Sequence, residues 1–252
     1  MESNLNRDLR LFGDSSRLFD IWPSLIKSPI LTHFSWSPLI IAAVAANAHI
    51  IHPALSSVNT SSFTPSSQPP PLSGLLALHI RRGDYAEHCV NIAKWSAFYM
   101  AFNQFPGLSD RFIRPEVPIR EDATIDDIGP YREHCFPDIG QIVTRVRDVR
   151  TALRPGTPLS RIYVLTNGRP EWLAELKEAL QADARSSGLG EWEHIGTSRD
   201  LRLTREQQHN AQAMDMAVAQ RAEVFLGNGV RFAIFCLILY CFLLTIHNSF
   251  RV

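Results

Sequence analysis

The chain has 252 residues, enough for one large domain or two small ones, and its hydrophobic and charged fractions of 45% and 20% are ordinary for a globular protein. Lysine plus arginine and aspartate plus glutamate each number 25, so the formal net charge is zero. Proteins that bind polyanions normally carry a basic excess, so the balanced charge argues against nucleic acid as a partner. Four cysteines are too few for a small disulfide-stabilised scaffold.

Residues 1–54 are predicted to form short helices and loops. Proline follows Trp22 and Ser37, and because proline disfavours helix at the residue before it, both sites should break the segment into pieces. No apolar run follows a basic start, so the beginning of the chain does not have the pattern of a signal peptide. Residues 55–74 are dominated by serine, threonine and proline, which predicts an extended linker or loop.

Residues 75–80 form a short apolar run, with Gly74 before it and a charged segment after it, which favours a buried parallel strand. A helix is expected at residues 93–102 and a loop at residues 106–137. Apolar residues then recur at helical spacing over residues 139–153, which predicts an amphipathic helix that packs one face against a core.

The second half of the chain continues as alternating strands and helices. Pro170 suits the first turn of a helix, and Thr204 with Gln207 is a capping-box signal for another helix that runs to about residue 222. Three further strands are expected at residues 161–166, 192–195 and 224–226. This alternation predicts an α/β fold with a Rossmann-like parallel sheet covered by helices on both faces.

Residues 230–252 form a hydrophobic tail, in which residues 232–246 are almost wholly apolar. As a helix, this apolar run would reach roughly 22 Å, short of the ~30 Å hydrocarbon core of a bilayer. Three interpretations are therefore open: a marginal membrane anchor, a buried helix, or an aberrant chain end.

Charged side chains directly follow the first predicted strand, in the sequence His-Ile-Arg-Arg-Gly-Asp at residues 79–84. In open α/β sheets, ligands bind beyond the carboxyl ends of the strands. Because side chains alternate along a strand, His79 and Arg81 should point one way and Arg82 the other. A guanidinium keeps its charge and its planar fork matches phosphate oxygens, while Asp84 is expected to hold Arg82 by an ion pair. The alternative is that both arginines merely cap the sheet with surface ion pairs.

The segment around residues 79–84 resembles the His-x-Arg motif of the GDP-fucose-dependent fucosyltransferases, the superfamily that includes the protein O-fucosyltransferases. Residues 163–168 and 212–229 are similar to segments of its fungal members. The resemblance covers roughly residues 75–229 as a series of spaced motifs. It implies that these residues are the donor-binding half of a GT-B glycosyltransferase and that residues 1–54 are an incomplete acceptor-side region.

The resemblance also implies a reaction, which is the inverting transfer of fucose from GDP-fucose to a hydroxyl of a protein or glycan. No metal or other cofactor is expected, and no Asp-x-Asp triplet occurs in the sequence. The implied compartment is the secretory pathway, the endoplasmic reticulum or Golgi, with membrane contact through residues 232–246 as an additional expectation.

By the same resemblance, Arg81 is the catalytic residue, which contacts the β-phosphate of the donor and assists its departure. His79 is expected near the donor, and Arg82 and Asp84 are included among the substrate-binding residues.

Further substrate-binding residues are expected at the end of the resemblance. Asp215 matches an acidic residue whose carboxylate would accept hydrogen bonds from guanine N–H groups, and a solvated helix carboxylate is the equally weighted alternative. Asn228 and Gly229 would form the turn into a diphosphate-binding helix.

The chain departs from the family pattern after Gly229. The family carries serine and threonine hydroxyls there, which at a helix N-terminus would hold the diphosphate, but this chain continues Val-Arg-Phe-Ala-Ile-Phe. A Gly-Gly-x-x-Asn segment expected in the first half is also missing. Two hypotheses therefore stand: an active fucosyltransferase, and a non-catalytic GDP-sugar binder or inactive truncated fragment.

Cys89 and Cys135 each follow a histidine. A zinc site fits them poorly, because adjacent histidine and cysteine residues are awkward ligands for one ion and zinc ligands usually lie a few residues apart. A disulfide in an oxidising compartment and a pair of buried free thiols remain about equally open.

Overall fold

The computed structural model describes residues 16–25, 27–56, 71–97, 112–153 and 158–227. Within these residues, parallel strands form a four-stranded sheet in the order β3-β2-β1-β4. The central strands are nearly continuous runs of buried side chains, as expected for parallel strands covered on both faces. The strand bounds are β1 (Leu72–Ile80), β2 (Arg161–Thr166), β3 (His194–Thr197) and β4 (Ala222–Gly227).

The register of the sheet brings the carboxyl ends of three strands to the same edge. Ile80 of β1 lies opposite Thr166 of β2, and His79 lies opposite both Leu165 of β2 and Gly227 of β4. The segments that follow β1 and β2 therefore leave the sheet side by side, next to the end of β4, which is where a ligand site is expected in an open α/β sheet.

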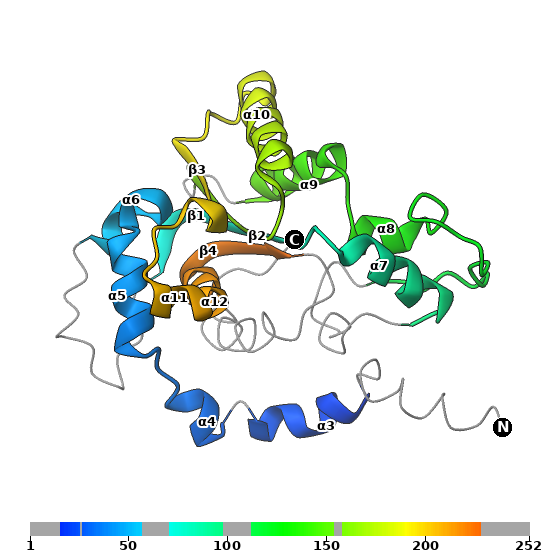
Figure 1. The fold of residues 1–252 in the computed structure, drawn as a ribbon, viewed down its shortest axis with the longest axis horizontal. Helices are drawn as coiled ribbons and strands as arrows, with labels where there is room; N and C mark the ends of the chain where they lie inside the picture. Colours follow the sequence, from blue (N-terminus) through cyan, green and yellow to red (C-terminus); the bar gives the residue numbers. More distant parts are fainter. Residues whose placement is uncertain (1–15, 26, 57–70, 98–111, 154–157, 228–252) are drawn as a thin grey trace.

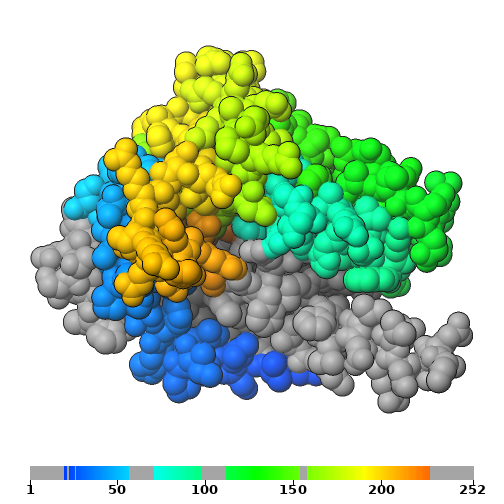
Figure 2. Space-filling model, viewed as in Figure 1, coloured from blue at the N-terminus to red at the C-terminus, as the bar shows by residue number. Residues whose placement is uncertain are grey.

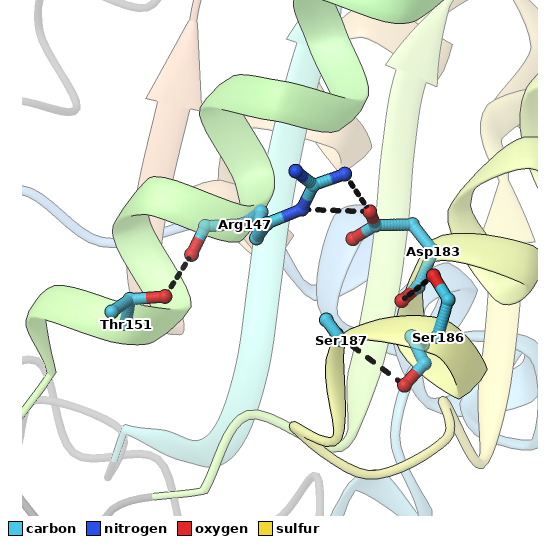
Figure 3. A network of polar contacts seen from close by, with 6 residues as sticks. Arg147, Thr151, Asp183, Ser186 and Ser187 are labelled. Atoms are coloured by element: carbon cyan, nitrogen blue, oxygen red, sulfur yellow. Dashed lines mark hydrogen bonds and ion pairs between the residues drawn. The ribbon is translucent and has the colours of Figure 1, made fainter.

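Helices α9 (Ile139–Ala152) and α10 (Pro170–Ser187) cover one face of the sheet (Figure 1). The two helices are also joined to each other, because both Nε and Nη2 of Arg147 donate to Oδ1 of Asp183, with Nε at 2.7 Å (Figure 3). The strand side chains buried under these helices include Leu76, Leu78, Ile80, Ile162 and Val164.

The ends of these two helices follow local sequence signals. Asp138 and Gln141 form a capping box at the start of α9, in which each side chain accepts the other residue's backbone N–H at 2.9 Å. Pro170 occupies the first turn of α10, and the helix ends at Gly188, whose φ of +71° is a left-handed conformation that glycine adopts readily.

Helices α5 (Pro38–Ala46) and α12 (Ala211–Arg221) pack on the opposite face. In Figure 2 the blue surface of α5 adjoins the gold surface of α11 (Arg205–His209) and α12. Fully buried Asn47 ties this face together, since its Nδ2 donates to the carbonyl of Arg202 at 3.1 Å and its Oδ1 accepts the Arg202 N–H at 2.8 Å. Part of the N-terminal segment therefore shares the core of the sheet.

Further short helices complete the described chain. Three belong to the N-terminal segment and one follows β3: α3 (Ser16–Leu25), α4 (Pro29–Thr32), α6 (Ala48–Ile51) and the 3-10 helix η4 (Ser198–Asp200). Another 3-10 turn, η1 (Pro53–Leu55), leads out of α6. In the described part of the chain, no helix is both long and apolar enough to span a bilayer.

Two helices lie beyond the carboxyl edge of the sheet, α7 (Tyr85–Lys94) and α8 (Pro130–Cys135) (Figure 1). With residues 112–128 they enclose a small core of their own, separate from the two layers of the sheet. The buried members of this core are Tyr85, Cys89, Ile92, Ala93, Phe112, Ala123, Ile128, Tyr131 and Cys135.

The expected strands are all present, with shifted ends. The strand predicted at residues 161–166 is confirmed at its bounds, whereas the first strand begins earlier, at Leu72, and the third begins later, at His194. The order of parallel strands and helices confirms the predicted α/β class with a Rossmann-like sheet.

Several helix predictions were wrong. Helix α7 begins at Tyr85, directly after the charged loop, and ends at Lys94, so it does not match the helix expected at residues 93–102, of which residues 98–102 lie outside the described residues. Helix α8 interrupts the loop expected at residues 106–137, where Pro130 opens a turn that buries two side chains.

Two other corrections concern helix breaks. Pro23 was expected to end a helix but lies inside α3. The single helix expected after Thr204 is divided at Asn210, whose side-chain Nδ2 donates to the carbonyl of Glu206 at 3.1 Å and so competes with the helical backbone. The capping box of Thr204 and Gln207 is confirmed, with reciprocal hydrogen bonds of 3.0 and 3.3 Å.

Candidate functional site at the carboxyl edge of the sheet

The loop after β1 turns sharply and is attached to the loop after β2. Gly83 has φ of +68°, and a Cβ at this position would approach Asn167 Nδ2 to 3.1 Å. Oδ1 of Asn167, which follows β2, accepts the backbone N–H of Arg82 at 2.7 Å. A left-handed backbone and a close neighbour both favour glycine here, so the residue that permits the turn also permits the contact between the loops.

Arg81 lies at the edge of the sheet and is partly exposed. Its Nη2 lies 3.3 Å from Oδ1 of Asp84, and its guanidinium lies over the ring of Tyr85, 4.8 Å from the centroid. The Arg81 side chain is 22% exposed and the Asp84 side chain 78% exposed. Asp84 therefore pairs with Arg81, which corrects the expected ion pair with Arg82.

Arg82 is buried among protein groups instead. Its guanidinium lies over the rings of Phe136 and Trp172, 4.3 Å from each centroid, and its Nη2 donates to the carbonyl of Pro137. Burial lowers the pKa of Arg82 to about 10, so the side chain remains charged at neutral pH. The side chains of the two adjacent arginines thus point in different directions, as the alternation along β1 predicts. Arg82 is buried and bonded to other protein groups, whereas Arg81 is partly exposed.

A cavity of about 540 Å³ lies beside His79, within the usual range for small-molecule sites. The carboxyl ends of β1 and β4 supply an apolar floor, and α8 and the first half of α9 supply polar groups. Polar side chains on its wall include His79, Glu133, His134, Thr144, Arg145 and Asp148. Among the described residues that line it, neither Arg81 nor Asp215 is present, so the structure does not gather all the predicted site residues into one cavity.

Asp215 joins α12 to the sheet. Its Oδ1 accepts the hydroxyl of Tyr163 in β2 at 2.7 Å, and Oγ of Ser198 lies 2.9 Å from both carboxylate oxygens. Burial raises the pKa of Asp215 to about 6, although the two hydrogen bonds act in the opposite direction. The alternative of a solvated helix carboxylate is therefore wrong, and a contact with guanine stays a prediction.

Sequence reasoning did not identify Tyr163 and Ser198 as partners of this carboxylate. A tyrosine in an otherwise apolar strand is a usable signal, because a buried phenol hydroxyl normally finds a hydrogen-bond partner. Ser198 carries no such signal, since it reaches Asp215 only through the turn after β3. Asn228 and Gly229 lie outside the described residues, as do residues 232–246.

Cys89 and Cys135 form a disulfide with a Cα–Cα distance of 5.8 Å, ordinary for such a bond. It connects α7 with α8, and both cysteines are fully buried. In the described ranges, no three histidine, cysteine or acidic side chains gather into a set that could hold a metal ion.

Comparison with known proteins returns no matching family model and no matching curated protein. Among solved structures, the chain is similar to POFUT1 in complex with GDP (14% identity, TM-score 0.48) and to POFUT1 in complex with GDP-fucose (14% identity, TM-score 0.49). Each match covers 88% of this chain and 47% or 46% of the POFUT1 chain. An apo form of POFUT1 matches with 15% identity and a TM-score of 0.47. The chain thus spans less than half the length of these structures.

Proposed function

We propose that the carboxyl edge of the sheet binds the diphosphate of GDP-fucose, and that the chain is a fucosyltransferase of the type that its motifs resemble. The observation that carries this proposal is the position of Arg81. Its partly exposed guanidinium projects from the end of a central parallel strand, where ligands of open α/β sheets bind. The segments around β2 and α12 favour the fungal members of that superfamily.

The chemistry required of Arg81 is stabilisation of negative charge. When the glycosidic bond to the diphosphate breaks, charge develops on the leaving phosphate, and a fixed guanidinium fork lowers the barrier by meeting it. Asp84 and the ring of Tyr85 hold this fork from one side, so little reorganisation is needed when the ligand arrives. Transfer with inversion to a protein or glycan hydroxyl, without a metal, completes the proposed reaction.

The disulfide supports a secretory location for this activity. Disulfides persist in oxidising compartments and are rare in the cytosol, and Cys89 and Cys135 are joined in the core of α7 and α8. We therefore place the protein in the endoplasmic reticulum or Golgi.

Calorimetric titration of the full chain with GDP, and with UDP as the mismatched nucleotide, tests the proposal. We expect the chain to bind GDP and Arg81→Ala to weaken binding at least about tenfold, the worth of one charge-assisted contact. Arg120→Ala is the matched control, because Arg120 is exposed and pairs with Asp122 at 3.3 Å. A folded chain that binds no GDP, or an Arg81→Ala variant with unchanged affinity, overturns the proposal.

A second candidate, a GDP-sugar binder without transferase activity, is favoured by two observations. No hydroxyl side chain stands in the six residues after Gly229, and Asp215 is engaged by Tyr163 and Ser198. Release of free GDP from GDP-fucose distinguishes the two: an enzyme releases GDP as fucose passes to an acceptor hydroxyl or, more slowly, to water, whereas a binder retains the donor intact.

A further inference from the structure

The α7–α8 unit, defined here as residues 85–94 and 112–136 with the disulfide between Cys89 and Cys135, contacts both arginines of the loop after β1. On the α8 side, the chain continues from Cys135 directly into Phe136 and Pro137. The ring of Phe136 lies 4.3 Å from the Arg82 guanidinium, and the carbonyl of Pro137 accepts its Nη2. Two of the residues that hold Arg82 inward, alongside Trp172 of α10, therefore follow directly after one cysteine of the disulfide.

On the α7 side, Tyr85 lies one helical turn before Cys89, so both side chains are on the same side of the helix. The Tyr85 ring lies 4.8 Å from the Arg81 guanidinium, and Asp84 at the start of the helix pairs with it at 3.3 Å. The residues that contact the Arg81 guanidinium therefore lie in, or directly before, the helix that carries the other cysteine of the same disulfide.

The loop after β1 joins these two sets of contacts. Gly83 has a left-handed backbone, and the hydrogen bond between Arg82 N–H and Asn167 Oδ1 is what attaches the loop to β2. Because Phe136 and Pro137 follow Cys135 and Tyr85 lies one turn before Cys89, a change in the distance between α7 and α8 is expected to alter the contacts of both guanidinium groups.

We propose that Cys89 and Cys135 are positioning residues of the phosphate site: their disulfide fixes α7 against α8 and so keeps Arg81 facing the ligand while Arg82 stays buried. This inference rests on the proposed function for its ligand. It adds that the affinity for the terminal phosphate, rather than for the nucleoside, depends on the disulfide.

The test compares GDP with GMP, which lacks the terminal phosphate, in calorimetric titrations of the full chain below its melting temperature. In the double variant Cys89→Ala with Cys135→Ala, we expect the GDP affinity to fall about tenfold while the GMP affinity changes less than about threefold. Arg81→Ala should show the same selective loss. A variant in which both affinities fall equally, or neither falls, overturns the inference.

Leu55→Ala serves as the matched control for lost stability, because Leu55 is fully buried on the opposite face of the sheet. It should reduce stability and leave the ratio of GDP to GMP affinity unchanged. A fall in that ratio for Leu55→Ala would also count against the inference, since lost stability alone would then explain the effect.

Amide hydrogen exchange supplies a readout that needs no ligand and so separates this inference from the proposed function. Without the disulfide, the amide of Arg82 should exchange faster, because its bond to Asn167 is no longer held by a fixed loop, whereas Leu55→Ala should leave it protected. If wild type binds no GDP but this exchange difference appears, the proposed function fails and the positioning role stands. Unchanged protection of Arg82 overturns the positioning role.

Discussion

The parallel sheet and the α7–α8 unit are stabilised by different interactions. In the sheet, long apolar strands are buried by helices from both sides, so that Leu75, Leu76 and Ile162 are completely inaccessible to solvent. The α7–α8 unit has two short helices and irregular chain around a smaller core, with a disulfide across it. Apolar burial stabilises the first region, whereas the second adds a covalent link that limits the freedom of the unfolded chain.

Arg82 shows how the two regions depend on each other. It belongs to the loop after β1, yet it lies over Phe136 of the α7–α8 unit and Trp172 of α10. Its neighbour Arg81 remains at the surface. The boundary between the regions is therefore also the place where the candidate site is formed, and perturbing either region should show different consequences there.

The largest expected effect is in the sheet. Leu76→Ala removes a fully buried side chain beneath α9 and α10, and should lower the free energy of unfolding by about 3–5 kcal/mol, measured by urea denaturation. Leu189→Ala, at a position 36% exposed, is the control and should change it by less than about 0.5 kcal/mol. A loss below about 1 kcal/mol in Leu76→Ala would contradict the picture of a tightly packed sheet.

The next effect is in the α7–α8 unit. Replacing Cys89 and Cys135 together by alanine removes a link between residues 46 apart, and should lower the free energy of unfolding by about 2–4 kcal/mol. Denaturation of wild type with and without reductant provides the control, since reduction should reproduce the loss. Equal stability of the variant and oxidised wild type would mean that the small core holds without the covalent link.

Asp215 makes the stability of the fold depend on pH. Its pKa is raised in the folded state to about 6 from an ordinary 3.8, so the folded chain holds the proton more tightly than the unfolded chain. The resulting stabilisation is present below about pH 4 and is lost as pH rises through about 6. The advantage of wild type over Asp215→Asn should therefore fall by about 2–3 kcal/mol between pH 4 and pH 7.

Denaturation of both proteins across this pH range provides the measurement. Asp122→Asn is the control, because Asp122 is 77% exposed beside Arg120 and its difference from wild type should stay nearly level. A level difference for Asp215→Asn as well would show that Tyr163 and Ser198 fully compensate the burial of the carboxylate.

The smallest expected effect is a difference in stability between lysine substitutions at the two adjacent arginines. Arg82→Lys replaces a planar guanidinium over two rings by a compact ammonium, and should cost about 1–2 kcal/mol of stability. Arg81→Lys, at the partly exposed site, should cost less than about 0.5 kcal/mol. Thermal denaturation of both variants measures the contrast, and equal losses would contradict the assignment of opposite surroundings.

The pattern of the sequence was sufficient for most of the sheet and insufficient for the α7–α8 unit. The strand at residues 161–166 and the helix beginning at Pro170 follow from an apolar run and a capping signal, which act over a few neighbouring residues. The prediction placed helix α7 too late in the chain. Its stripe at Tyr85, Cys89 and Ile92 is buried only because α8 packs against it. Local patterns cannot reveal a partner that lies far along the chain.

For the candidate site too, the sequence predicted some features and missed others. The alternation of side chains placed Arg81 and Arg82 on opposite sides, but the partner of Asp84 was misassigned, because Arg81 and Arg82 are both close enough in sequence to pair with it. Arg82 turns inward to Phe136, Pro137 and Trp172, which are 54 or more positions away in sequence. Asp215 likewise met Tyr163 and Ser198 only through the packing of α12 on the sheet.

By itself, the sequence determined the α/β class and the four strands, because burial periodicity and capping are properties of short segments. Tertiary structure decided which charged groups stay partly exposed, as Arg81 does, and which are held by other protein groups, as Arg82 and Asp215 are. That choice depends on distances between residues far apart in the chain, where desolvation and hydrogen bonding compete for each guanidinium and carboxylate.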